Sequence, residues 1–308
     1  MRIGLMLGDI IGPSTVQEQV QQAVDAENDG FDTAWFGQLM GIDALTITAL
    51  AGASTSRIEL GTGVIPTFPR HPYVMAQQAL TVQGATNNRF VLGIGLSHQI
   101  VIEAMYGLSY EHPARHMREY LSVLRPLIAE GRVAFQGKVY RTAANLRVPG
   151  AQPMPVLIAA LAPKMLHLAG EVADGTMLWM SGLKTIETHV MPKITAAANE
   201  AGRPAPRIAA GLPICVTDDI AAGRESAAKV FQMYGQLPNY RRMLDKEGAA
   251  GPADVAIVGD EASVEKQIRA LASVGVTDFV APIYATGADR EDSVARTRAL
   301  LKSLVGKV

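Results

Sequence analysis

The sequence predicts an α/β fold, a (β/α)8 (TIM) barrel with insertions, on the basis of three observations. Apolar segments of strand length alternate with segments of helical periodicity along the whole 308-residue chain. Most of the apolar segments are continuous rather than alternating, as parallel strands buried on both faces should be. A glycine that ends a helix also precedes a buried strand in DGFDTAWF, ADGTMLWM and VGVTDFVAPI. Repeated strand–helix units of this kind suit a closed barrel.

The expected strands number eight, and helices separate them. The strands are residues 2–7, 33–36, 58–64, 90–94, 156–160, 176–180, 208–216 and 278–283. The helices include residues 14–30, 43–54, 72–85, 114–130, 186–201, 220–234, 262–274 and 289–304, and one that begins at Pro163. Ser14, with Gln17 three residues later, indicates a capping box on the first helix.

Two stretches do not fit this alternation. Residues 131–153 are rich in Gly, Pro and Arg, and residues 235–254 are polar. Regular strand–helix units flank both, so we interpret them as insertions in one domain that spans residues 1–308.

A doubly wound sheet is the competing fold, and its dinucleotide fingerprint G-x-G-x-x-G is missing. The pattern that begins at Gly61 ends in Pro66, and the pattern that begins at Gly93 ends in His98. Both fail at the last glycine, which favours the barrel.

Composition excludes several classes of function. The 28 Lys and Arg against 29 Asp and Glu give a formal net charge of −1, so we expect no nucleic-acid partner. No apolar stretch reads as a membrane span, and Asp9 interrupts the apolar N-terminus before a signal-peptide core could form. The single cysteine, Cys215, excludes an intramolecular disulfide and fits a cytoplasmic location. We expect it to be a small buried hydrophobe in the seventh strand.

Chemistry in a barrel sits where the strands end, and here those positions are mostly Gly, Ala, Leu, Val and Met. Such a lining suits a large planar or apolar ligand. We expect no metal site: His112 and His116 are four residues apart without a carboxylate between them, and we interpret both as surface or helix-start residues.

His98 directly follows a strand-ending G-x-G, where its side chain would face the barrel mouth. An imidazole there could donate a proton near neutral pH. The alternative is a helix-start residue bonded to a neighbouring loop.

A second candidate lies before the helix at Pro163. Free backbone N–H groups at 160–162, with Lys164 beside them, would suit a phosphate. Alternatively, Pro163 simply begins a helix.

Four segments together resemble the luciferase-like flavin-dependent oxidoreductases. They are IELGTGVIPTFPRHPYVMAQQALTVQGATNNRFVLGIGLSH, PVLIAALAPKMLHLAGEVADGTMLW, GLPICVTDD and FVAPI, and the resemblance covers essentially the whole chain. The sequence is most similar to the actinobacterial branch that uses the deazaflavin coenzyme F420, which is related to methylenetetrahydromethanopterin reductases.

The resemblance implies a site for the cofactor. A non-prolyl cis peptide at Gly63–Val64 would back the central flavin ring, and loops at 95–97 and 160–162 would hold the phosphate-bearing tail. The cofactor-binding residues it implies are Gly8, Gln38, Thr62, Gly63, Val64, Gly95, Leu96, Ser97, Ala160, Leu161, Ala162 and Lys164.

The sequence also departs from the family. Sugar-phosphate-oxidising relatives carry an Asp-His pair where this chain has Gln38 and Leu39, and a Glu where it has His98. We therefore expect a less polar substrate than a sugar phosphate. The catalytic acid–base role would fall to His98.

These residues favour a coenzyme F420-dependent oxidoreductase that transfers a hydride between the deazaflavin and a small organic substrate. One alternative is an FMN-dependent luciferase-like monooxygenase. Another is a flavin-binding relative without turnover. The family also implies a homodimer that pairs through barrel helices.

Overall fold

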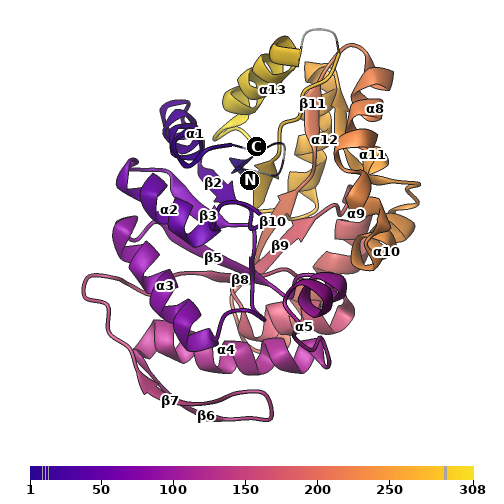
Figure 1. The fold of residues 1–308 in the computed structure, drawn as a ribbon. Helices are drawn as coiled ribbons and strands as arrows, with labels where there is room; N and C mark the ends of the chain where they lie inside the picture. Colours follow the sequence, from indigo (N-terminus) through magenta and orange to yellow (C-terminus); the bar gives the residue numbers. More distant parts are fainter. Residues whose placement is uncertain (9, 11, 13, 288–289) are drawn as a thin grey trace.

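The protein forms a closed barrel of eight parallel strands surrounded by helices (Figure 1). The computed structural model describes residues 1–8, 10, 12, 14–287 and 290–308. Around the barrel the strands run β1 (Arg2–Leu7), β2 (Thr33–Phe36), β3 (Glu59–Thr62), β5 (Phe90–Gly95), β8 (Val156–Ile158), β9 (Gly175–Trp179), β10 (Arg207–Gly211) and β13 (Asp278–Ala281). Strand β13 pairs with β1 and closes the ring. The barrel prediction is confirmed.

Helices follow the strands close to their expected positions. They are α1 (Val16–Asn28), α2 (Ala44–Ala53), α3 (Pro72–Ala85), α4 (Pro113–Glu130), α5 (Pro163–Val172), α6 (Leu183–Thr185), α7 (Met191–Glu200), α8 (Ile220–Val230), α9 (Gln232–Gln236), α10 (Pro238–Glu247), α11 (Pro252–Val255), α12 (Glu261–Ser273) and α13 (Arg290–Leu304). Two π-helical turns, η1 (Val101–Met105) and η2 (Ile186–Val190), accompany them. The first capping box lies one residue later than expected: Thr15 caps α1, and Glu18 bonds back to it.

The expected third and seventh strands are each broken. The third ends at Thr62, and a two-residue strand, β4 (Ile65–Pro66), resumes beside β5. The seventh ends at Gly211, and Pro213, which has no N–H to donate to a ladder, precedes β11 (Ile214–Val216). Strand β11 pairs with β12 (Ile257–Gly259) in a separate sheet. Cys215 is therefore buried as expected, but it lies outside the barrel.

Both insertions are regular structures. Within residues 131–153, β6 (Arg132–Gln136) and β7 (Arg141–Asn145) form an antiparallel hairpin beside α4 (Figure 1). The Glu119 carboxylate on α4 holds the turn of the hairpin, because it accepts hydrogen bonds from the backbone N–H groups of residues 138–140. Residues 235–254 are largely helical and contain α10.

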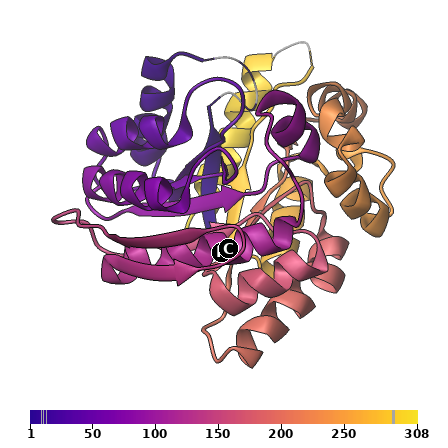
Figure 2. The same cartoon turned by 60° about the horizontal axis from the view of Figure 1, so that its bottom comes forward.

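An ion network closes the barrel at the amino ends of the strands. The Arg207 guanidinium contacts Asp278 at 2.6 Å and Glu59 at 2.5 Å, and its carbon lies 5.4 Å from the centre of the Trp35 ring. Arg2 also contacts Asp278, at 2.9 Å. The Asp278 side chain is fully buried, so its charge depends on these two arginines. The chain termini meet at the same end, side by side in both views (Figures 1 and 2).

Replacing Arg207 by Ala should lower the free energy of unfolding by about 3 kcal/mol, because it leaves the buried Asp278 carboxylate with Arg2 as its one cationic partner. Urea denaturation measures the change. The matched control is Arg132→Ala, since Arg132 is mostly exposed and forms a loose ion pair with Glu130. It should change stability by less than about 0.5 kcal/mol. Equal effects of the two changes would contradict this role for the network.

Candidate active site at the carboxyl end of the barrel

Inward-facing side chains of the barrel form a tight apolar layer at mid-height. This middle layer consists of Met6, Trp35, Val91, Leu157, Met177, Ala209 and Val280. None of its members is more than 5% exposed. The layer is a solid floor, as in other barrels of this size.

The layer above the floor has almost no side chains. Side chains on a strand alternate between its two faces, so the inward positions above the floor lie two residues further along each strand. Those positions are Gly8, Gly37, Gly93, Ala159, Trp179, Gly211 and Pro282. Gly8, Gly37, Ala159 and Trp179 are partly exposed, whereas the floor is not. We infer that a hollow lined largely by backbone opens at the carboxyl ends of the strands, and among these seven positions Trp179 has the one large side chain.

The Gly63–Val64 peptide is cis, as expected, and it lies on this floor. A Cβ on Gly63 would stand 3.0 Å from the Met6 methyl carbon and 3.2 Å from that of Met177. The Val64 side chain lies against Gly95, where a Cβ would come within 2.7 Å of it. Glycine at 63 and 95 thus keeps this side of the hollow flat.

Two residues expected to bind the cofactor have side chains that are already engaged. The Thr62 hydroxyl is buried and exchanges two 2.9 Å hydrogen bonds with the backbone of Gly93. The Gln38 side chain accepts a hydrogen bond from the backbone N–H of Ala44, where α2 begins. Both residues can therefore shape the site, while their side-chain groups serve the fold.

Unusual backbone conformations gather at the same end of the barrel. Gly8 after β1 has a φ of 83°, Ser97 after β5 has 59°, and Met180 after β9 has 55°. Such values are uncommon for Ser and Met, and they occur preferentially at functional sites. The sequence predicts both as strand-end positions, and the resemblance implies a cofactor-binding role for Ser97 alone.

The expected phosphate-binding loop lies at the start of α5. Ala162 precedes the helix, Pro163 is its first residue, and no side chain caps its first turn. Lys164 is exposed beside it. The ring of buried His189, at 2.8 Å from the carbonyl of Leu161, supports the loop from behind.

Two further lysines lie near this loop. Lys193 and Lys246 both help to lower the pKa of His189, although burial of its ring is the main cause. They belong to α7 and α10, which are distant from α5 in sequence. No spacing in the sequence could have revealed that both lie near His189, the residue behind this loop.

His98 lies after β5, as expected, and its ring is half-buried. Its backbone carbonyl accepts hydrogen bonds from Val101 and Ile102 where η1 begins, so it is also a helix-start residue. Burial lowers the pKa of its imidazole. The ring lies 5.4 Å from that of Tyr240, centre to centre.

The ring of Tyr240 begins a continuous series of aromatic contacts. Tyr240 lies 5.5 Å from Tyr234, and Tyr234 lies 5.4 Å from Trp179, each pair edge to face. We call His98, Tyr240, Tyr234 and Trp179 the aromatic wall. It joins the ends of β5 and β9 through α9 and α10.

The interpretation of His116 as a surface or helix-start residue is wrong. His116 is 4% exposed, and its ring stacks on Phe68 with centres 3.8 Å apart. Its Nε2 lies 2.9 Å from the Thr67 hydroxyl. Helical spacing gave no sign of this burial, because the residues that cover His116 come from the loop after β4. His112 does precede α4, as expected.

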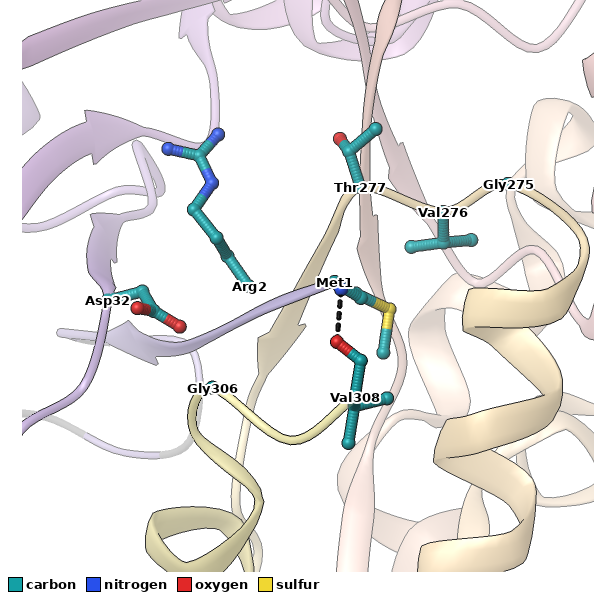
Figure 3. Close-up of a pocket in the computed structure, with 8 residues that line it drawn as sticks. All are labelled: Met1, Arg2, Asp32, Gly275, Val276, Thr277, Gly306 and Val308. Carbon is teal, nitrogen blue, oxygen red and sulfur yellow. Dashed lines mark hydrogen bonds between the residues drawn. The ribbon is translucent and has the colours of Figure 1, made fainter.

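Another hollow lies at the amino ends of the strands. It has a volume of about 530 Å³, and Arg2, Asp32 and Thr277 line it beside the chain termini (Figure 3). Barrel enzymes carry out their chemistry at the opposite end. The glycine-lined hollow is therefore the candidate active site.

In residues 1–8, 10, 12, 14–287 and 290–308, no three His, Cys, Asp or Glu side chains gather as metal ligands would. None of the helices in these ranges is both long and apolar enough to cross a membrane.

Comparison with known proteins decides the family. Residues 1–278 match the description of the luciferase-like monooxygenases. The chain belongs to this family. A Mycobacterium tuberculosis protein with the provisional name coenzyme F420-dependent oxidoreductase is 29% identical, over 91% of this chain and 94% of its own.

Solved structures share the fold. The coenzyme F420 dependent tetrahydromethanopterin reductase of Methanopyrus kandleri superposes with a TM-score of 0.75 at 22% identity, over 99% of this chain and 98% of that one. The oxygenating constituent of 3,6-diketocamphane monooxygenase from Pseudomonas putida, in complex with FMN, gives 0.77 at 18% identity, over 100% and 97%. At these identities the likeness concerns the fold alone.

The pKa of His116 is lowered to about 4, mainly by burial, and this makes stability depend on pH. Between about pH 4 and pH 6.5 the His116 imidazole is protonated in the unfolded chain and neutral in the folded chain. The free energy of unfolding should therefore rise by roughly 3 kcal/mol between about pH 4 and pH 6.5 on account of this group.

The test compares His116→Gln with the wild type in urea denaturation across that range. The variant keeps a polar partner for Thr67 and should lose this part of the slope. His112→Gln, at an exposed position, should retain it. An unchanged slope in His116→Gln would show that burial does not suppress protonation of His116.

Proposed function

We propose that the protein is a coenzyme F420-dependent oxidoreductase that exchanges a hydride between the deazaflavin and a small organic substrate. The observation that carries the proposal is the hollow above the floor. Its inward positions are Gly, Ala and Pro apart from Trp179, so a flat ring system fits without displacing side chains. When bound, F420 supplies two-electron hydride chemistry at a ring carbon.

Proposed contacts to the ring come from one arc of the barrel, formed by the ends of β1, β2, β3 and β5. The apolar face of the Gly63–Val64 peptide would back the ring, with backbone groups of Gly8 and Gly95 beside it. Gln38 and Thr62 would contribute through backbone atoms, because their side chains are engaged.

Proposed contacts to the anionic tail come from the loops after β5 and β8. The first supplies Leu96 and Ser97, and the second supplies Ala160, Leu161 and Ala162. The uncapped first turn of α5 offers backbone N–H groups to a phosphate. Lys164, together with Lys193 and Lys246, would add the positive charge that the sequence alone did not provide.

His98 is the proposed proton carrier. Its lowered pKa keeps the imidazole neutral at physiological pH, so that it is ready to accept a proton. A neutral imidazole suits oxidation of a hydroxyl group, in which a proton leaves oxygen as the hydride leaves carbon. In the reverse direction the protonated ring would return the proton.

An FMN-dependent monooxygenase is the second candidate, because the P. putida enzyme with FMN bound has the same fold. A flavin-binding relative without turnover is the third.

Titration with reduced F420 and reduced FMN should show tighter binding of F420, because its tail carries more negative charge for the three lysines. Lys193→Ala combined with Lys246→Ala should weaken F420 binding about tenfold at low salt and less at high salt. Lys266→Ala, exposed on α12, is the matched control. Preference for FMN, with oxygen uptake that depends on substrate, would overturn the proposal in favour of the monooxygenase.

His98→Ala should slow substrate oxidation at least about a hundredfold without abolishing cofactor binding. The wild-type rate should be full above the pKa of His98 and fall as the pH drops through it, below the usual range for histidine. The variant should lack this acidic limb, whereas His167→Gln on exposed α5 surface should keep it. An unchanged rate and pH profile in His98→Ala would exclude the role.

We also propose that the protein forms a homodimer through α2 and α3. Neither helix contains a charged residue, and each leaves a large apolar side chain exposed, Leu50 at 44% and Val74 at 41%. Leu50→Arg with Val74→Arg should convert a dimer to a monomer in sedimentation velocity. Val230→Arg, on equally exposed α8 surface, should not. A wild type that sediments as a monomer would refute the dimer.

We further propose a cytoplasmic location and one functional domain over residues 1–308. A buried cysteine with a pKa raised to about 11 has no reactive thiolate to protect, which is compatible with that location.

A further inference from the structure

Trp179 is an anomaly in the hollow. Six of the seven inward positions above the floor are Gly, Ala or Pro, and the seventh is tryptophan, which has the largest side chain of the standard amino acids. Trp179 stands directly above Met177, and a Cβ on Gly63 would contact Met177. The indole is partly exposed and therefore lies at the edge of the hollow, against β10 and α9.

The indole ring is held firmly. A Cβ on Gly211 would come within 2.8 Å of its Cε3 atom, so glycine at 211 makes room for the ring. Tyr234 and Phe231 contact it edge to face, at 5.4 Å and 6.1 Å between ring centres. These contacts fix its orientation.

The polar atom of this ring has no protein partner. The Trp179 Nε1 is buried and makes no hydrogen bond to any residue that the structure describes, and the same holds for the Ser181 hydroxyl two residues later. The other tryptophan differs, because the Trp35 Nε1 donates to the Thr33 hydroxyl at 2.9 Å. A buried donor without an acceptor costs about 1–3 kcal/mol, so it is expected where a ligand supplies the acceptor.

From this geometry we infer that the aromatic wall binds the substrate, and that the Trp179 N–H donates to a substrate oxygen. The inference rests on the proposed function and adds the class of substrate: an aromatic ketone or aldehyde, or the corresponding alcohol. Tyr234, Tyr240 and His98 offer ring surfaces to a planar aromatic group. The two tyrosines belong to α9 and α10 beside the end of β9, which adjoins β8 at the edge of the arc left for the cofactor, and His98 follows β5 within that arc.

In the reaction that this arrangement would support, F420 supplies the two electrons that the substrate gains. In the reducing direction a hydride from reduced F420 forms a C–H bond at the carbonyl carbon, and the carbonyl oxygen takes a proton delivered through His98. The ketone becomes an alcohol, and reduced F420 becomes oxidised F420. The hydrogen bond from Trp179 polarises the carbonyl and stabilises the negative charge that develops on its oxygen.

Indole N–H resonances in a 15N-labelled sample test the inference directly, because the chain has two tryptophans and hence two such signals. Trp179→Phe assigns them. Acetophenone should move the Trp179 indole proton downfield, whereas ethylbenzene, of similar shape but without the oxygen, should move it little. Trp35 is the internal control and should not respond to either compound. The titrations are run on protein with and without oxidised F420.

Affinity measurements on variants separate the two parts of the inference. Trp179→Phe should weaken acetophenone binding about fivefold and leave ethylbenzene within about twofold, because it removes only the donor. Tyr240→Leu should weaken both compounds about threefold or more, while Tyr73→Leu on α3 should affect neither.

Several outcomes would overturn the inference. They are an unmoved Trp179 signal with acetophenone, no binding of either compound to the wild type, or a loss of F420 affinity alone in Trp179→Phe. The last would assign the N–H to the cofactor. Failure of the proposed function would be recognised separately, because wild-type protein would then not bind F420. The acetophenone titration of cofactor-free protein would still test whether the aromatic wall binds the compound.

Discussion

Hydrogen-bonded closure of β13 on β1 is the constraint on which every other feature of the molecule depends. It brings Arg2 beside Asp278 in register and turns alternate side chains of all eight strands toward one axis. Once the ring is closed, the interior has a fixed width, and each inward position either fills it or leaves it empty. The buried network of Arg207 with Asp278 seals the amino end, and in the apolar floor above that network the indole N–H of Trp35 has the Thr33 hydroxyl as its partner.

The empty layer above the floor follows from glycine rather than from any flexible loop. A barrel of eight strands is normally filled by its own side chains, so a hollow requires positions where the side chain is missing. Gly37 provides it most clearly, since a Cβ there would meet only the Gly63 carbonyl at 3.8 Å, and Gly63 and Gly95 flatten the adjoining wall. At the same end of the barrel the backbone adopts uncommon positive φ values at Ser97 and Met180.

The insertion that contains α9 and α10 gives the hollow its chemical character. The Glu247 carboxylate at the end of α10 accepts hydrogen bonds from the backbone of Lys184 and Thr185, and so ties α10 to the loop after β9. This anchorage sets Tyr234 and Tyr240 against Trp179 and His98. A generic barrel mouth thereby acquires an aromatic side.

The sequence by itself determined the features that depend on local pattern. These are the alternation of strands and helices, the α3 boundaries at Pro72 and Ala85, and strand ends that carry few large side chains. These features depend on propensity and period within a few residues, which a sequence displays directly. The position of the cis peptide came from resemblance to a family. Only the tertiary structure decided which distant side chains meet, because sequence separation carries no information on packing. Packing alone placed His116 against Phe68, the two lysines near His189, and Cys215 in a sheet outside the barrel. It also left the Trp179 N–H without a partner, a feature that exists only once the barrel is closed around it.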